Sequence, residues 1–216
     1  MTRIISPSIL SADFMHLGRD IEMLNASRAE WIHIDVMDGV FVPNISFGFP
    51  VLSAARKVTS KVLDTHLMIV EPERYIERFA RAGADLITIH EEATENLEAA
   101  LRQIQAAGVR TGVSIKPATP VDRIVPYLPM LDLVLIMSVE PGFGGQAFIE
   151  GSLDKVRQLR EAITRAGCST LIEIDGGITV ENAGAAFEAG CDILVAGNTV
   201  FGSENPTRTI EQLLNA

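Results

Sequence analysis

The feature that most constrains the fold is a regular alternation of short apolar runs with amphipathic segments along the 216 residues. The runs are almost continuously apolar, which is typical of parallel strands buried on both faces. Helical patterns lie between them, and Ser152–Arg165, for example, gathers its apolar residues on one face. The expected strands are Ile4–Leu10, Trp31–Val36, Val62–Met68, Leu86–His90, Arg110–Ile115, Leu133–Met137, Leu171–Asp175 and Ile193–Ala196.

An Ala-Gly pair precedes four of these strands, at 82–83, 107–108, 166–167 and 189–190. Glycine suits the left-handed residue that ends a helix, so each pair indicates a helix end. The average of about 27 residues per strand–helix unit is close to the minimum for such a unit. The pattern predicts a single (β/α)8 barrel over residues 1–216. An open doubly wound sheet shares the alternation, but the first turn lacks the G-x-G-x-x-G typical of dinucleotide-binding folds.

Charge and composition exclude several classes of protein. The chain has 18 Lys and Arg residues against 28 Asp and Glu, a formal net charge of −10, so it has no cationic excess for nonspecific nucleic-acid binding. Phosphate ligands stay possible because backbone amides bind them. The longest apolar run is far shorter than a membrane helix, and the N-terminus lacks a signal-peptide pattern. Cys168 and Cys191 fit no metal motif or disulfide framework. We expect a cytoplasmic protein without a membrane partner.

Ionisable residues gather where a barrel carries its chemistry, at the carboxyl ends of the strands. In WIHIDVMDG, His33 and Asp35 share one strand face, His66 lies near the end of the third strand, and Asp175 ends the seventh. Two imidazoles and two carboxylates suit Zn²⁺, Fe²⁺, Co²⁺ or Mn²⁺ better than Mg²⁺ or Ca²⁺. We expect one divalent ion, zinc first, held by these four residues. The alternative is that the histidines are structural and the aspartates cap loops.

Asp35 and Asp175 belong to strands two and seven and should face each other across the barrel mouth. Opposed carboxylates can remove a proton from one face of a carbon and return one to the other face, with a metal stabilising the enediolate between. The alternative is that both are ligands only. Three methionines at strand ends are expected to line the pocket, or else to fill the core: Met37, Met68 and Met137.

Glycine-rich loops follow the last three strands and predict a phosphate site. Phosphate sites in barrels often use the loops after strands seven and eight, where backbone amides point at the anion. The residues concerned are Gly142, Phe143, Gly144, Gly145, Gly176, Gly177, Gly197 and Asn198. A Schiff-base aldolase would need a lysine inside the barrel, and only Lys116 stands at a strand end.

These motifs together resemble the ribulose-phosphate 3-epimerase family, and the resemblance covers every predicted unit. The matching segments are SPSILSADF, HIDVMDGVFVPNISFG, DTHLMI, MSVEPGFGGQAFI, IEIDGGI and VAGNTVF. The resemblance implies interconversion of D-ribulose 5-phosphate and D-xylulose 5-phosphate, with the metal ligands, acid/base pair and phosphate contacts on the residues named above. It adds substrate contacts for Ser8 and His66, and it implies homo-oligomers, either dimers or hexamers.

Two adjacent positions depart from the family pattern. Asn198 stands where serine is common, and Thr199 follows where alanine is frequent. The main-chain amide survives this change, but the preference among phosphorylated ketoses is left open. The alternatives are a D-allulose-6-phosphate 3-epimerase, a barrel sugar-phosphate aldolase and a catalytically silent phosphosugar-binding protein.

Overall fold

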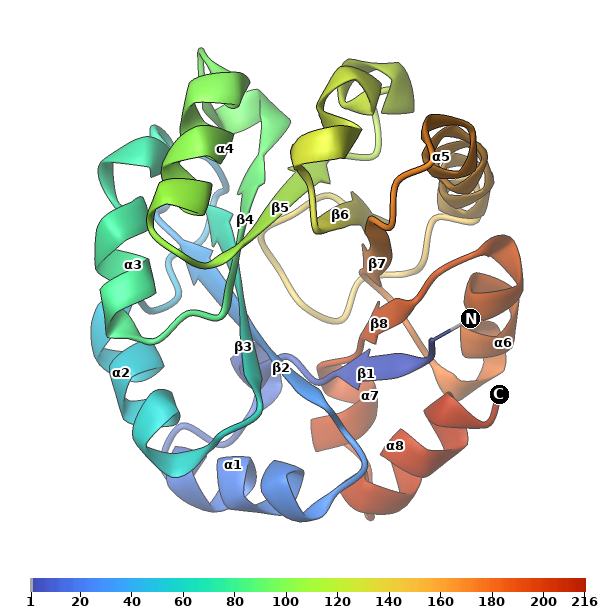
Figure 1. The fold of residues 1–216 in the computed structure, drawn as a ribbon. Helices are drawn as coiled ribbons and strands as arrows, with labels where there is room; N and C mark the ends of the chain where they lie inside the picture. Colours follow the sequence, from blue (N-terminus) through green and yellow to red (C-terminus); the bar gives the residue numbers. More distant parts are fainter. Residues whose placement is uncertain (1) are drawn as a thin grey trace.

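The computed structural model describes residues 2–216 and contains eight parallel strands inside a ring of helices (Figure 1). The order in the sheet is β1-β8-β7-β6-β5-β4-β3-β2, and a parallel bridge between Ser8 and His33 joins the two end strands. The (β/α)8 barrel predicted from the sequence is therefore confirmed, and the open sheet is excluded. The strands are β1 (Ile4–Ser6), β2 (Trp31–Met37), β3 (Val62–Met68), β4 (Leu86–His90), β5 (Arg110–Ile115), β6 (Leu133–Met137), β7 (Leu171–Asp175) and β8 (Ile193–Val195).

Helices follow most strands and cover the outside of the barrel (Figure 1). The α-helices are α1 (Leu17–Ala26), α2 (Phe49–Val58), α3 (Ile76–Ala82), α4 (Leu97–Ala106), α5 (Ser152–Ala166), α6 (Val180–Ala189), α7 (Asn198–Phe201) and α8 (Pro206–Leu214). The glycine of each Ala-Gly pair has a positive φ, as expected at a helix end. Among residues 2–216, no helix combines the length and the apolar character needed to cross a bilayer.

Two segments differ from the regular pattern. The first apolar run stops being a strand at Ser6, because Pro7 follows and Ser8 caps the short 3-10 helix η1 (Ile9–Ser11). Between β5 and β6, the 3-10 helices η4 (Val121–Arg123) and η5 (Val125–Met130) replace the expected α-helix. Four prolines in residues 117–129 explain the second difference, since proline cannot donate to a helical hydrogen bond.

The parallel register decides which side chains point into the barrel. Between β2 and β3, every second pair of the register is Trp31–Val62, His33–Asp64, Asp35–His66 and Met37–Met68. Trp31 packs with Leu86, Leu133 and Ile193 in an apolar cluster separate from the main core, which fills the space between strands and helices. Because side chains alternate along a strand, the ionisable pairs lie on the same inward face as Trp31. The barrel interior is thus apolar at its amino end and ionisable above it.

Aspartates fasten the amino ends of neighbouring strands. Asp85, Asp132 and Asp192 each stand just before an even-numbered strand. Each accepts a hydrogen bond from a backbone N–H at the start of the preceding strand, over 2.8, 2.8 and 2.9 Å, respectively. The two similar phrases RAGADLITI and EAGCDILVA each contain such an aspartate. We call these three residues the strand clamps.

We expect Asp192→Ala to lower the free energy of unfolding by about 2–3 kcal/mol, because it leaves the N–H of Ile172 without an acceptor inside the protein. Arg160 would also lose its ion pair with Asp192, although its hydrogen bonds to the carbonyl of Gly190 would remain. Denaturant unfolding monitored by circular dichroism measures the change. Asp154→Ala is the control, since that carboxylate is 71% exposed and its loss should change the free energy of unfolding by less than about 0.5 kcal/mol. An equal effect of both substitutions would contradict the role of the clamp.

Candidate active site

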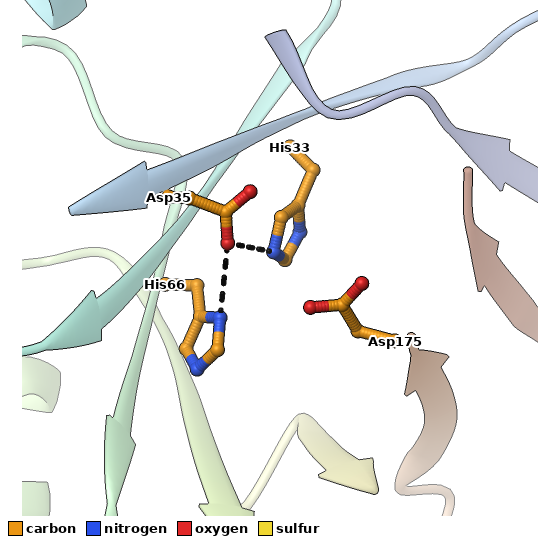
Figure 2. A group of neighbouring side chains, drawn as sticks. All are labelled: His33, Asp35, His66 and Asp175. Carbon is orange, nitrogen blue, oxygen red and sulfur yellow. Dashed lines mark hydrogen bonds and ion pairs between the residues drawn. The ribbon is translucent and has the colours of Figure 1, made fainter. Parts of the chain in front are cut away.

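Four ionisable side chains meet near the carboxyl ends of β2, β3 and β7 (Figure 2). Asp35 lies centrally, with its Oδ1 3.3 Å from Nε2 of His33 and 3.3 Å from Nδ1 of His66. Asp175 reaches toward them from β7, on the other side of the barrel (Figure 2). One ligand atom from each of the four lies within 4.8 Å of the others. The structure therefore brings together all four residues expected to hold a metal.

The donor atoms of this cluster fit a divalent cation. His33 Nε2 is buried and has no hydrogen-bond partner, although it points at the cluster. Buried polar atoms in proteins are nearly always satisfied, so an unpartnered nitrogen here favours an additional ligand. Two imidazole nitrogens and two carboxylates are also the ligand types that borderline divalent metals prefer.

The pKa values of the two carboxylates are driven apart in the protein alone. Burial would raise the pKa of Asp35, but the charge of His33 and the close contacts with the rings of His33 and His66 hold it well below its usual value. Burial, and then the negative charge of Asp35, raise the pKa of Asp175 to about 7. At neutral pH one carboxylate is therefore ionised and the other is near half-protonation, which suits a base and an acid.

A second layer of ionisable groups lies below the cluster, and sequence reasoning missed it. Asp64 accepts a 2.6 Å hydrogen bond from Nδ1 of His33, and Glu173 lies 3.7 Å from the same nitrogen. Both carboxylates are fully buried. Burial and the nearby charge of Asp64 raise the pKa of Glu173 well above its usual value. Each acid stands two positions before a predicted ligand, His66 or Asp175, so the strand alternation could have found them.

A cavity of about 490 Å³ opens over the cluster. Every residue predicted to bind phosphate lines it, as do the three predicted methionines. Ser8 lines it too, and its Oγ donates a 2.5 Å hydrogen bond to Oδ2 of Asp35. His33 and His66 are fully buried and lie beneath the cavity wall. Lys116 is outside the lining residues, and its Nζ lies 3.9 Å from the centre of the Phe41 ring.

The glycine-rich end of the cavity is tightly built. The backbone of Gly197 passes so close to Ser11 that a Cβ there would lie 2.6 Å from its Oγ. That Oγ donates a 2.6 Å hydrogen bond to Oδ1 of Asn198, so Ser11 is a further residue that the sequence did not reveal. Gly177 has a positive φ, and a Cβ there would lie 2.6 Å from the backbone nitrogen of Phe148. Side chains at these glycines would collide with Ser11 and with the backbone of Phe148.

The sequence is similar to one protein family over nearly its whole length. The sequence model of the ribulose-phosphate 3 epimerase family matches residues 4–201. The ribulose-phosphate 3-epimerase of Synechocystis sp. is 47% identical over 215 residues, covering 99% of this chain and 94% of the relative. That of Bacillus subtilis is 46% identical over 210 residues, covering 97% of both. The chloroplastic ribulose-5-phosphate-3-epimerase of Arabidopsis thaliana is 47% identical, covering 96% of this chain and 75% of the relative.

Solved structures of lower identity share the fold. A 3-hexulose-6-phosphate synthase superposes with a TM-score of 0.69 at 17% identity, covering 100% of this chain and 99% of its own. KGPDC from Streptococcus mutans gives a TM-score of 0.74 at 14% identity, covering 100% of this chain and 97% of its own. At these identities the likeness shows a common barrel and no more.

The raised pKa of Asp175 predicts how the metal-free protein responds to pH. The folded protein holds this proton up to about pH 7, whereas the unfolded chain releases it near the ordinary value of 3.8. Stability should therefore fall as the pH rises from about 5 to about 8. Asp175→Asn should remove about 2–4 kcal/mol of that fall.

Denaturant unfolding in the presence of a chelator, at about pH 5 and about pH 8, measures this difference. Asp154→Asn serves as the exposed control and should keep the slope of the original protein. Parallel pH profiles for the original protein and Asp175→Asn would contradict the raised pKa.

Proposed function

The chain belongs to the ribulose-phosphate 3-epimerase family, and from this premise we propose that it interconverts D-ribulose 5-phosphate and D-xylulose 5-phosphate by proton transfer at carbon 3. It is an enzyme of the isomerase class. The observation that carries the proposal is the opposition of Asp35 and Asp175, one from β2 and one from β7, at the floor of a cavity with a glycine-rich end. This arrangement supports epimerisation at a carbon held between the two carboxylates.

Each carboxylate acts on one face of the substrate. One aspartate accepts the proton from carbon 3, and the electron pair of the broken C–H bond moves into the adjacent ketone to give an enediolate. The other aspartate, protonated beforehand, donates its proton to the opposite face of carbon 3. The configuration at carbon 3 is thereby inverted, and the protonation states of the two carboxylates are exchanged. In the metal-free protein the pKa of Asp35 is lowered and that of Asp175 is raised, so the two carboxylates start from different protonation states.

His33, Asp35, His66 and Asp175 would hold the divalent cation, and Zn²⁺ is the first candidate because of the mixed nitrogen and oxygen donors. When bound, the cation supplies positive charge where negative charge develops on the substrate oxygens. Ser8 orients the carboxylate of Asp35 through its hydrogen bond and contributes a hydroxyl to the cavity. Met37, Met68 and Met137 provide an apolar surface for the planar part of the intermediate.

The glycine-rich end of the cavity is the proposed phosphate site. Its backbone amides bind an anion without a lysine, which agrees with the net charge of −10. The contacting residues are Gly142, Phe143, Gly144, Gly145, Gly176, Gly177, Gly197 and Asn198, all of which line the cavity. The segment Gly142–Gly145 acts as a lid that excludes water, and Asn44 anchors it by donating a 2.8 Å hydrogen bond to the carbonyl of Gly142.

We also propose, from the family resemblance, that the protein acts in the cytoplasm as a homo-oligomer. Dimers and hexamers are the two forms that the resemblance implies. Light scattering combined with size-exclusion chromatography distinguishes them from a monomer.

Proton NMR of D-ribulose 5-phosphate in D₂O tests the reaction and the mechanism together. With Zn²⁺-loaded protein we expect D-xylulose 5-phosphate that carries deuterium at carbon 3. Asp175→Asn should lower turnover by about 100-fold or more, the usual loss when an acid/base group is removed. Its zinc content must be measured in parallel, because Asp175 is also a proposed ligand.

Three results would overturn parts of this proposal. No exchange with folded, zinc-loaded protein would reject the five-carbon substrate, and D-allulose 6-phosphate is then tested in the same assay. Exchange that survives complete metal removal would reject the role of the cation. Full turnover by zinc-loaded Asp175→Asn would reject the two-carboxylate mechanism.

A further inference from the structure

His90 is the one buried histidine that the proposed mechanism does not use. It ends β4, next to β3, and its side chain is fully buried. Its Nε2 lies 2.8 Å from Nε2 of His66, and the ring centres are 4.9 Å apart. On its other side, Nδ1 of His90 lies 3.2 Å from Oε2 of Glu92. His90 therefore connects a proposed metal ligand to a carboxylate on the adjoining 3-10 helix η3 (Glu91–Ala93).

The contacts of this chain influence where each ring proton lies. An ionised carboxylate can only accept, so Glu92 favours a proton on Nδ1 of His90. With that proton in place, Nε2 of His90 accepts, and the 2.8 Å contact between the two rings has His66 donate from its Nε2. Asp35 favours the opposite arrangement, with the proton of His66 on Nδ1. A cation bound to Nδ1 of His66 is compatible only with the arrangement that Glu92 favours.

An unprotonated Nδ1 beside a carboxylate is the state that a cation requires. Nδ1 of His66 and Oδ1 of Asp35 lie 3.3 Å apart, and in this tautomer both are electron-pair donors. Metal-binding histidines usually donate their other N–H to a carboxylate or carbonyl, which fixes the tautomer and the ring orientation. His33 follows that rule directly, through its 2.6 Å hydrogen bond to Asp64. For His66 the carboxylate is one residue further away, with His90 between them.

Glu92 is itself held in place. Its Oε1 accepts a 2.8 Å hydrogen bond from the backbone N–H of Lys116 and a second one from the hydroxyl of Thr119. Both donors come from the loop after β5, so Oε2 is directed at His90. The ring of Phe41 lies against His90, with centres 4.8 Å apart, and limits its rotation.

We propose that Glu92 and His90 are positioning residues that hold His66 in its Nε2–H tautomer and so preorganise the metal site. This inference rests on the proposed metal-dependent function and extends it to residues that do not face the cavity. In the resulting order, Glu92 orients His90, His90 orients His66, and His66 presents a free electron pair at Nδ1.

Glu92→Gln gives the sharpest test, because it can reverse the direction of the hydrogen bonds that join residue 92, His90 and His66. The amide oxygen of the new side chain is expected to keep the two donors from Lys116 and Thr119, which leaves its NH₂ group facing His90. Nδ1 of His90 must then become the acceptor, and His66 must carry its proton on Nδ1. Long-range ¹⁵N–¹H NMR of the metal-free protein reports both tautomers. We expect the fraction of His66 that carries its proton on Nε2 to be larger in the original protein than in Glu92→Gln.

Zinc affinity provides a second readout that does not depend on turnover. Competition with a chelating dye should show affinity roughly 10- to 100-fold lower for Glu92→Gln, the usual range for losing an outer partner of a ligand. Glu91→Gln is the matched control, since that neighbouring carboxylate contacts Arg123 instead of His90, and it should stay within about 2-fold. His90→Phe, which removes the ring nitrogens, should weaken zinc binding at least as much as Glu92→Gln.

The outcomes separate this inference from the proposed function. An unchanged tautomer of His66 and an unchanged zinc affinity in Glu92→Gln would overturn the positioning role even if the enzyme epimerises its substrate. A shift of His66 toward Nδ1–H together with weaker zinc binding in Glu92→Gln would support the positioning role. This holds even if D-ribulose 5-phosphate shows no exchange, in which case only the proposed function fails.

Discussion

Placing ionisable side chains inside a barrel is the constraint on which the rest of this structure depends. The register of β2 and β3 directs His33, Asp35, Asp64 and His66 into the interior, where water cannot compensate their charges. Each of these groups therefore needs a partner from another strand. Asp64 and His66 lie on β3, the strand next to β2, whereas Ser8 and Glu173 reach Asp35 and His33 only because the barrel is closed. Closure of the sheet and assembly of the site are consequently one event.

Compensation is incomplete at the floor of the cavity, where we place the chemistry. His33 is satisfied by Asp64 on its lower side but faces the cluster with an unpartnered nitrogen. The raised pKa of Asp175 has the same origin, because a second carboxylate is buried beside an ionised one. The protein thus keeps an excess of electron-pair donors at the floor of the cavity. Such an arrangement is costly for an empty protein and favourable once a cation is present.

Much of the fold and the proposed site follows from sequence periodicity. The spacing of two in WIHIDVMDG identified His33 and Asp35 as one face, and the structure places them together. The same spacing leads to Asp64 and Glu173, which were missed because their partners are visible only from the register between strands. His90 was missed for the same reason. The absent helix between β5 and β6 reflects proline content, which periodicity of apolar residues does not register.

The strand clamps and the proposed catalytic residues occupy opposite ends of the same strands. Asp85, Asp132 and Asp192 secure the amino ends, whereas the cavity is built at the carboxyl ends by loops and strand-end residues. Changes in the loops therefore leave the fastening of the barrel intact. In evolutionary terms, this division lets a lineage diversify its substrates by accumulating loop substitutions without first losing the ability to fold.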